Sequence, residues 1–346
     1  MNAITIGLDI AKSVFQVHVE DAAGKIIHQK RLRRSQVEAF FARQPASVVG
    51  LEACGSAPYG GRRLRALGHE VRLIPAADVK PFVRRNKTDA RDAAAICLAL
   101  QHPDLRLVRI KSVEQQACSL ERSRALLVRQ HTQLCNSVRG QLAAHGLVAA
   151  QGRRGFAELA ALLAAGDDRL PAALLPVLRL LLEQIEHLAA GIAQLEQRIV
   201  AAARTDAAMR RLATIPGVGP IVAHAIVAAA GAGRQFRSAR DFAAWAGLTP
   251  RAHSSAGKRR DKGISRQGDS RLRKLLALGA STLMRNARAC PQRATAWQHG
   301  ILARRPIKVA VLAQAAKTAR IAWAVLTSGA AYQAHRQARP VKAAQA

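Results

Sequence analysis

The chain has 346 residues, 54 lysines and arginines against 22 aspartates and glutamates, and a formal net charge of +32. This length predicts two or three domains, and so large a positive charge favours nucleic acid as the partner. Aromatic residues make up only 3% of the chain, and no apolar run of membrane-spanning length and no signal peptide is evident, which argues against a membrane protein. The five cysteines are scattered without a CxxC pair, so we expect free thiols in a cytoplasmic, bacterial protein rather than disulfides or zinc ligands.

The first hundred residues alternate between short apolar strands and helical segments. Strands are predicted at AITIGLDI, SVFQVHVE and KIIHQKRL, followed by a helix at SQVEAFFARQ, a strand at SVVGLEA, a helix at RRLRALG and a strand at HEVRLIP. Three successive strands followed by strand–helix alternation predict an α/β domain with a mixed sheet and an antiparallel meander at one edge.

The next segment, residues 112–205, is rich in Leu, Ala, Gln, Glu and Arg and shows no strand pattern. Apolar residues recur there with alternating spacings of three and four, as in a coiled-coil seam of about three heptads, and Pro176 bars its extension upstream. A weaker seam of Leu120, Leu127 and Leu134 lies upstream. An intramolecular helical hairpin is one interpretation, and a dimerising coiled coil is the one that we favour. The seam consists of Leu178, Leu181, Ile185, Leu188, Ile192, Leu195 and Ile199.

Residues 206–330 form a third, helical and strongly basic region. From Arg251 to the end there are 20 lysines and arginines and only two acids, Asp261 and Asp269. We therefore expect an α/β plus α protein with an α/β domain at 1–110, a helical region at 111–205, a mostly helical domain at 206–330 and a flexible tail at 331–346.

Four carboxylates in the first hundred residues are candidates for a metal site. Asp9 ends the first strand and Glu52 lies in the fourth, where an acid is costly to bury unless it is paired or bound to a cation. Asp89 and Asp92 share one face of a helix that begins after Thr88. A core carboxylate and an exposed helix start are the ordinary alternatives for each alone. Together the four predict a site for Mg²⁺ or Mn²⁺, with two ions able to act on a phosphodiester.

Two further stretches are candidate nucleic-acid contacts. Just before the acidic helix stand the basic residues Arg84, Arg85 and Lys87. Further along, IPGVGP joins two apolar helical segments as in a helix–hairpin–helix, where Gly217 and Gly219 would let backbone amides approach a phosphate. A tight helix–helix turn explains the same pattern equally well.

The segment at residues 242–280 contains a polar loop with two adjacent serines, Ser254 and Ser255. A serine nucleophile needs activation and stabilisation of the developing charge. The loop supplies cations, but no base is evident apart from the nearby His253. From chemistry alone, phosphate contact is the commoner role of such a loop, and a catalytic serine is the alternative. The cations around the serines are Arg251, Lys258, Arg259, Arg260, Lys262 and Arg266.

Taken together, these motifs resemble the DEDD transposases of the insertion-sequence family 110. The resemblance rests on GLDIAK, GLEACG, NKTDARDA, IPGVGP and FAAWAGLTPRAHSSAGKRRDKGISRQGDSRLRKLL, which stand in the family's order and span almost the whole chain. It implies a RuvC-like, RNase H-type N-terminal domain, a helical coiled-coil insertion and a C-terminal transposase domain. It also implies that Asp9, Glu52, Asp89 and Asp92 are the DEDD set. The family's serine lies five residues after the proline of GLTP, which gives Ser255. Ser254 stands where an acidic residue is usual, so the assignment between the two serines is open.

The resemblance implies a bridge-RNA-guided DNA recombinase that works on the ends of an insertion sequence and on its target. Mg²⁺ or Mn²⁺ on the carboxylates and a serine nucleophile would cut and rejoin strands, and a structured non-coding RNA would select the DNA. The enzyme would act as a homo-oligomer, dimer or tetramer, in the cytoplasm and without a membrane. Two other hypotheses are a metal-dependent endonuclease similar to a Holliday-junction resolvase, with water as nucleophile, and a non-catalytic nucleic-acid-binding protein.

Overall fold

The computed structural model describes residues 4–83, 88–103, 105, 107–113, 115, 120–255 and 258–334, and between 252 and 262 it describes the backbone alone. The chain divides into two compact units, Met1–Gln116 and Ala117–Ala346.

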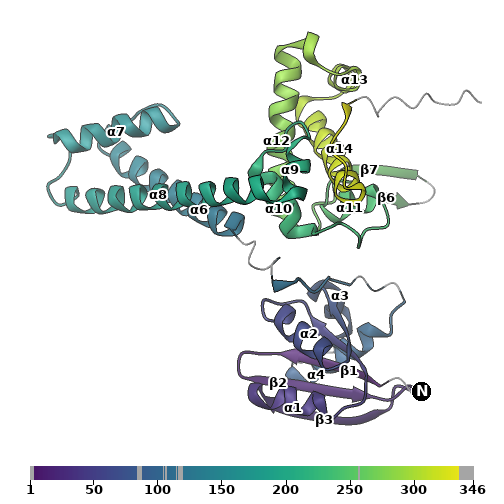
Figure 1. Cartoon of the computed structure of the whole chain (residues 1–346). Helices are drawn as coiled ribbons and strands as arrows, with labels where there is room; N and C mark the ends of the chain where they lie inside the picture. Colours follow the sequence, from purple (N-terminus) through teal and green to yellow (C-terminus); the bar gives the residue numbers. More distant parts are fainter. Residues whose placement is uncertain are drawn as a thin grey trace, which may run out of the picture. The chain divides into compact units, whose positions relative to one another are not determined.

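The N-terminal unit is built on a five-stranded sheet with the order β3-β2-β1-β4-β5 (Figure 1). Strand β2 pairs antiparallel with both β1 and β3, whereas β4 runs parallel to β1 and β5 runs parallel to β4. The predicted mixed sheet with an antiparallel meander at one edge is thereby confirmed. The strands are β1 (Thr5–Ile10), β2 (Val14–Glu20), β3 (Ile26–Arg33), β4 (Val48–Glu52) and β5 (Glu70–Ile74).

Helices cover both faces of this sheet. On one face, Leu8 and Leu51 pack with Phe41 of α1 (Val37–Ala42) and Leu64 of α2 (Ala57–Ala66). On the other face, α4 (Asp89–Leu100) packs against β1, β2 and β4. Successive residues of a strand point to opposite faces. The residues that flank Leu8 in β1 and Leu51 in β4 therefore face α4. The short elements of this unit are η1 (Arg34–Gln36), α3 (Ala76–Val79) and η2 (Lys80–Phe82).

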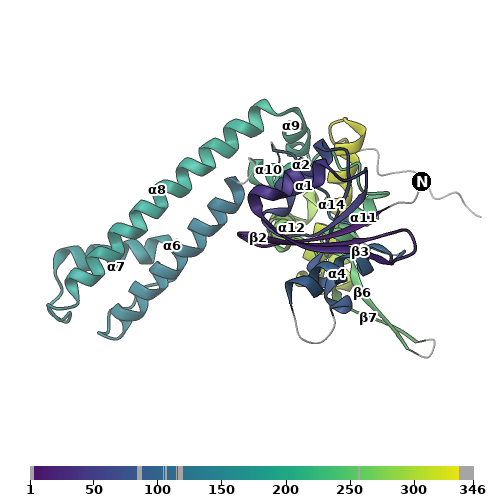
Figure 2. The ribbon, with the colours of Figure 1, turned by 90° about the horizontal axis from the view of Figure 1, so that it is seen from below.

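The C-terminal unit begins with a long helical hairpin, in which α6 (Leu120–Ala143) and α8 (Leu175–Thr205) lie side by side (Figure 2). The far end is closed by α7 (Arg153–Ala165), through a core that includes Leu142, Leu159 and Leu178. All seven residues of the predicted seam on α8 are buried or half-buried, and Gly191 of α8 lies against Leu127 of α6. The seam packs within the chain, as in the hairpin interpretation; a dimeric coiled coil remains a prediction.

Helices at the other end of the hairpin form the main core of this unit. The central helix is α14 (Ile307–Ser328), whose Ala315, Ala319 and Ala322 are fully buried. Small residues at this spacing let α11 and α12 pack closely on it. The surrounding helices are α9 (Ala207–Ala213), α10 (Pro220–Ala230), α11 (Ala239–Trp245), α12 (Ser270–Ala289), η3 (Pro291–Arg293) and α13 (Ala296–Arg304).

The helix α14 also modifies the expectation that no segment reaches membrane-spanning length. Within the described residues, it is the one helix that is long and apolar enough to cross a membrane. Its alanine face is buried in the core of the C-terminal unit. The same helix carries three basic residues, Lys308, Lys317 and Arg320, which are exposed or half-buried. A core helix of a globular unit has this composition when small residues fill its packed face, and we assign α14 that role.

The polar loop with two serines, expected within residues 242–280, is a two-stranded antiparallel ribbon instead. Strand β6 (Pro250–Ser255) pairs with β7 (Lys258–Ile264), and the last pair in the register is Ser255 with Lys258. The prediction of a loop was wrong because polar and basic residues follow one another along both strands, so the sequence lacks the apolar alternation of a half-buried sheet. We refer to residues 250–264 as the serine ribbon.

Candidate active site

Three of the four predicted carboxylates come together in the N-terminal unit. Oxygen atoms of Asp9, Asp89 and Asp92 all lie within 4.8 Å of one another. Asp9 and Asp92 are half-buried, and Asp89 is exposed, so the cluster opens to solvent on one side. We call these three residues the carboxylate cluster. Like charges this close repel one another unless a cation or proton lies between them.

Two glycines explain how the strand and the helix bring these carboxylates together. A Cβ atom at Gly7 of β1 would lie 2.0 Å from the carbonyl oxygen of Ala93, and one at Gly50 of β4 would lie 2.7 Å from Ile96 Cγ2. The backbone of α4 therefore rests directly on β1, and side chains of α4 pack against Gly50 of β4. The next residues on the same strand face are Asp9 and Glu52. The repeated pattern Gly-Leu-acid, in GLD and GLE, is the sequence signal of this close approach.

Glu52 lies at the end of β4, the strand that runs parallel to β1 and next to it. The parallel register pairs Leu8 with Leu51, so the following residues, Asp9 and Glu52, end neighbouring strands at the same edge. Its side chain is half-buried, but Glu52 does not belong to the group whose oxygens all lie within 4.8 Å. The structure thus brings Glu52 to the rim of the cluster rather than into it.

The start of α4 is fixed locally by the residue that precedes it. Thr88 is extended, and its Oγ1 accepts a hydrogen bond from the backbone N–H of Arg91 at 3.4 Å, as predicted for an N-cap. This places Asp89 and Asp92 in the first turn on one face. Carboxylate oxygens are hard ligands that suit a divalent cation such as Mg²⁺ or Mn²⁺, so the donor set fits such an ion.

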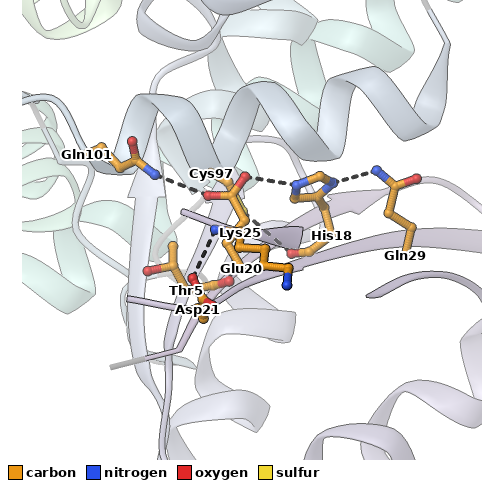
Figure 3. Close-up of polar contacts among 8 residues, drawn as sticks. All are labelled: Thr5, His18, Glu20, Asp21, Lys25, Gln29, Cys97 and Gln101. Atoms are coloured by element: carbon orange, nitrogen blue, oxygen red, sulfur yellow. Dashed lines mark hydrogen bonds and ion pairs between the residues drawn. The ribbon is translucent and has the colours of Figure 1, made fainter. Parts of the chain in front are cut away.

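A polar network around the buried His18 and Glu20, which the sequence did not reveal, connects the far end of α4 to the sheet (Figure 3). His18 Nε2 donates to Glu20 Oε1 at 2.9 Å, and Gln101 Nε2, after the last turn of α4, donates to Glu20 Oε2 at 3.1 Å. Gln29 Nε2 donates to His18 Nδ1 at 2.9 Å, which places the ring proton on Nε2. Both carboxylate oxygens of Glu20 are therefore hydrogen-bonded. The network holds the helix that presents Asp89 and Asp92.

The same network contains a second group of side chains with metal-ligand chemistry, His18, Glu20 and Cys97, all buried. Burial, and the nearby Glu20, raise the pKa of the Cys97 thiol to about 12, so the thiol stays protonated. Its Sγ donates to the carbonyl oxygen of His18 at 3.5 Å. Since the hydrogen bonds already account for this group, we interpret it as structural.

The serine ribbon of the C-terminal unit is anchored at its base by two glycines with positive φ. A Cβ atom at Gly247 would lie 2.1 Å from Gln267 O, and one at Gly268 would lie 1.8 Å from Trp245 O. Arg273 Nη1 donates to the carbonyl oxygens of Ala246 and Gln267 at 3.1 and 2.8 Å. The junction between α11 and the ribbon therefore allows little change, and Ser254 and Ser255 lie at the opposite end of β6.

The IPGVGP turn has two glycines with different surroundings. Gly217 has φ +80°, and a Cβ atom there would lie 2.9 Å from Leu283 Cδ1 and 3.0 Å from Gly279 O, so packing against α12 requires glycine. Gly219 precedes α10 as its N-cap, and a Cβ atom there would meet no other atom within 4 Å. A phosphate contact stays a prediction for both glycines, and Gly219 has the open surroundings that such a contact needs.

The remaining predicted contacts divide by whether the structure describes them. Arg251 and Arg266 are exposed, and Arg266 has a positive φ of 59° beside the ribbon's base. Residues 84–87, with Arg84, Arg85 and Lys87, lie outside the described residues. So do the side chains of Ser254, Ser255, Lys258, Arg259 and Arg260.

Two family models match the chain over the regions that contain these sites. One is described as "Transposase IS116/IS110/IS902 family" and matches residues 209–297, which include the IPGVGP turn and the serine ribbon. The other, described as "Transposase" and named for the DEDD proteins of the IS110 type, matches residues 6–146. That range contains Asp9, Glu52, Asp89 and Asp92.

Several relatives are similar over nearly their whole length. The "Probable family 20 transposase" of Pseudomonas aeruginosa is 47% identical over 96% of this chain and 99% of that protein. The "Transposase for insertion sequence element IS1111A" of Coxiella burnetii is 36% identical over 95% and 91%, and the transposase for IS1328 of Yersinia enterocolitica is 35% identical over 96% and 99%.

Among solved structures, "T. thermophilus RuvC in complex with Holliday junction substrate" matches 31% of this chain and 99% of that one. The sequence identity is 10% and the TM-score is 0.23. The full-length similarity to the curated relatives settles the family. The chain belongs to the IS116/IS110/IS902 family of insertion-sequence transposases, enzymes that cut and rejoin DNA.

Proposed function

We propose that this transposase is a RuvC-like, RNase H-type metalloenzyme whose carboxylates act together with a serine nucleophile. The observation that supports it is the convergence of Asp9, Asp89 and Asp92, whose oxygens lie within 4.8 Å of one another. A strongly basic DNA-cutting enzyme has no other evident use for a cluster of negative charge at the place where a phosphodiester must approach.

Asp9, Asp89 and Asp92 would hold the divalent ion, and Glu52 at the rim would complete its ligands or those of a second ion. When bound, Mg²⁺ supplies positive charge that stabilises the phosphorane-like transition state and the leaving oxygen. The half-buried Asp9 and Asp92 keep the position of the site fixed. The site is open to solvent on the side of the exposed Asp89, and the DNA backbone would approach from that side.

The serine step that we propose is a transesterification. Ser255 Oγ forms a bond to the scissile phosphorus, the bond from phosphorus to the 3′-oxygen breaks, and the serine proton ends on the departing 3′-hydroxyl. A 3′-hydroxyl of another strand then attacks the phosphoserine, and Ser255 regains its proton. Because one phosphate ester replaces another, the exchange needs no ATP. Ser254 is the alternative nucleophile.

The proposal extends to the partners of the reaction. The net charge of +32 suits both DNA and a structured guide RNA, since both are polyanions. The two candidate sites belong to different units of the chain, which is compatible with a site completed between subunits of a dimer or tetramer. Action in the bacterial cytoplasm, where DNA and RNA are present, completes the proposal.

A suicide-substrate assay tests the nucleophile. The full-length protein, purified with its own RNA, is given nicked element-end DNA and Mg²⁺, then denatured and digested for mass spectrometry. We expect a phosphodiester adduct on Ser255, its loss in Ser255→Ala with nucleic-acid binding retained, and its persistence in Ser254→Ala. An adduct on Ser254 alone would move the nucleophile by one residue.

Two further outcomes separate the alternative functions. Cleaved DNA without an adduct would favour water as the nucleophile and a resolvase-like endonuclease. Cleavage that persists in Asp9→Asn, or without a divalent ion, would overturn the metal site, because that substitution removes one of the three clustered charges. Glu52→Gln is the graded test, since this carboxylate lies at the rim of the cluster.

A further inference from the structure

A cavity in the C-terminal unit has no role in the proposed strand exchange. Its volume is about 530 Å³, and its walls come from the IPGVGP turn, α12, η3, α13 and α14. This volume falls within the range of roughly 300–1,000 Å³ that small-molecule sites occupy. Exposed residues at its border, including Ala289 and Arg293, open it to solvent.

The charge of the residues that line the cavity favours anions. Arg293 and Lys317 line it, and no aspartate or glutamate is among the lining residues that the structure describes. From Ser270 to the C-terminus the sequence contains 14 lysines and arginines and no acid. A cationic recess without a carboxylate of its own is stabilised when an anionic group such as a phosphate enters it.

Lys317 is held at this cavity by an aromatic ring. Its Nζ lies 4.5 Å from the centroid of the Trp297 ring, a cation–π contact that orients the ammonium group. Burial lowers the pKa of Lys317, and the positive charge of Arg320 lowers it further. A phosphate beside this partly desolvated ammonium would reverse both effects, since it compensates for the lost water and opposes the repulsion.

The interior wall supplies the other half of a binding site. Gln314 and Thr318 are only 7% and 3% exposed and line the cavity. Gln314 Nε2 donates one hydrogen bond, to Thr318 Oγ1 at 3.2 Å, whereas a primary amide offers two N–H groups and a carbonyl oxygen. Base edges present the same donors and acceptors, which amides recognise. Ile215, Pro216 and Leu283 give the apolar surface for a ring.

We propose that this cavity binds one unpaired nucleotide of a polynucleotide, with its base against the apolar wall and Gln314 and its phosphate beside Lys317 and Arg293. Pro216, which lines the cavity, belongs to the turn that ends in Gly219, the N-cap of α10, so the cavity adjoins the turn predicted to contact a phosphate. The inference rests only on action upon nucleic acid, and it is independent of the serine step.

Fluorescence anisotropy on the full-length protein tests the base. The probes are labelled duplexes with one bulged thymidine, the same duplexes with an abasic bulge, and RNA counterparts of both with uridine. We expect the intact bulge to bind about tenfold more tightly than the abasic one, since stacking and contact with one base contribute on that scale. A preference in RNA alone would assign the nucleotide to RNA, and one in DNA alone to DNA. Equal binding of the intact and the abasic probe, in DNA and also in RNA, would overturn the proposal.

Matched variants locate the effect. Ala289→Trp fills the exposed border of the cavity without changing charge, and it should remove the preference for the intact bulge while abasic binding stays the same. Ala303→Trp, at an exposed position of α13 outside the cavity, should keep the preference. Lys317→Ala should reduce the preference, because the phosphate reaches Lys317 only when its base enters the cavity. Lys308→Ala, at an exposed position of the same helix, should weaken the binding of both probes equally. A preference that survives Ala289→Trp would place the base elsewhere.

The native Cys290, which lines the cavity, allows a second test that does not depend on affinity. The bulged base is given a short tether that ends in a mixed disulfide, and the thiolate of Cys290 displaces the leaving thiol to form a protein–DNA disulfide. We expect mass spectrometry to map the adduct to Cys290 and Cys290→Ser to lose it. Trapping at the exposed Cys54, with none at Cys290, would contradict the proposal.

Discussion

The carboxylate cluster and the serine ribbon are both positioned by glycines at which two backbone segments touch, but the functional side chains lie at different distances from these contacts. Asp9 follows Gly7 by two residues on the same strand face, and α4 lies on that glycine. In the ribbon, Gly247 and Gly268 fix the base, whereas Ser255 lies five residues beyond Pro250. At about 3.3 Å per residue, that is on the order of 17 Å from the anchored end.

This difference agrees with the chemistry that we propose for the two sites. Metal ligands must keep their mutual distances to within a few tenths of an ångström, so they belong on packed elements close to the contact that fixes them. A nucleophile must reach a phosphate and afterwards release it to another strand. In a ribbon that is fixed at one end, the base sets the direction in which the strands run, and the other end is left accessible to DNA.

The largest effect is expected from Gly7→Ala. A methyl group there would lie 2.0 Å from Ala93 O, so α4 must move away and take Asp89 and Asp92 with it. A shift of about 1 Å costs on the order of 100-fold in activity. We expect that loss in Mg²⁺-dependent cleavage, together with weaker Mn²⁺ binding by calorimetry. Gly60→Ala, whose methyl would make an ordinary 3.5 Å contact with Ile10, is the matched control. Full metal affinity in Gly7→Ala would show that the close approach of α4 does not position the ligands.

The next effect is expected from Gly268→Ala, which tests the other side of the comparison. This glycine has φ +75°, and its Cβ would lie 1.8 Å from Trp245 O, so we expect a loss of roughly 1–3 kcal/mol in the C-terminal unit. Strand exchange should fall while Mn²⁺ binding to the N-terminal unit stays the same. Gly263→Ala, in β7, adds a methyl group that would meet no atom within 4 Å. This variant should leave strand exchange and Mn²⁺ binding unchanged. Weakened Mn²⁺ binding in Gly268→Ala would show that the two sites are not independently positioned.

A smaller effect is expected from the buried network at the other end of α4. Glu20→Ala removes the acceptor for the buried His18 and for the exposed Gln101, and leaving the buried His18 N–H unsatisfied costs roughly 1–3 kcal/mol. Hydrogen exchange should accelerate in the last turn of α4, and cleavage should fall less than in Gly7→Ala. A double-mutant cycle with Gln101→Ala measures the coupling. Additive effects would mean that the hydrogen bond from Gln101 does not hold the helix.

The elements of the N-terminal unit were predictable because each has a local pattern. Buried strands appear as apolar runs, Thr88 marks the N-cap, and the Gly-Leu-acid repeat is visible in the sequence. The sequence could not show that Glu52 lies at the rim rather than within the cluster, since that depends on how α4 packs across β1 and β4. The network of His18, Glu20 and Gln101 joins residues about eighty positions apart, and no local pattern predicts such a contact.

The C-terminal unit was harder to predict for two physical reasons. The strands of the serine ribbon consist largely of polar and basic residues, so they lack the apolar alternation that identifies a strand. The seam of α8 has the spacing of a coiled coil whether its partner is α6 or a second chain, and Gly191 against Leu127 is a tertiary contact that spacing cannot distinguish. The cavity between α12 and α14 likewise exists only after the helices pack.

The smallest effect concerns the residue that links the ribbon's anchored base to α12. Asp269 caps this helix, accepting hydrogen bonds from the backbone N–H groups of Arg271 and Leu272 at 2.9 and 3.1 Å. Burial raises its pKa, but these bonds and the Arg271 guanidinium outweigh that effect, so the pKa lies below its ordinary value of 3.8. The native state therefore binds fewer protons here than the unfolded chain, so the stabilisation is complete above about pH 5, where the unfolded carboxyl is ionised, and is lost as the pH falls through the folded-state pKa.

We accordingly expect Asp269→Ala to cost about 1 kcal/mol at pH 7 and less at pH 3, whereas Asp269→Asn keeps the cap and loses only the dependence on pH. Urea unfolding followed by tryptophan fluorescence measures this in the right unit, because Trp245, Trp297 and Trp323, the three tryptophans of the chain, all lie in the C-terminal unit. A difference between Asp269→Ala and the parent protein that stays constant from pH 7 to pH 3 would show that Asp269 stabilises α12 without its charge. The anchoring of the ribbon's base would then rest on Gly247, Gly268 and the bonds of Arg273 alone.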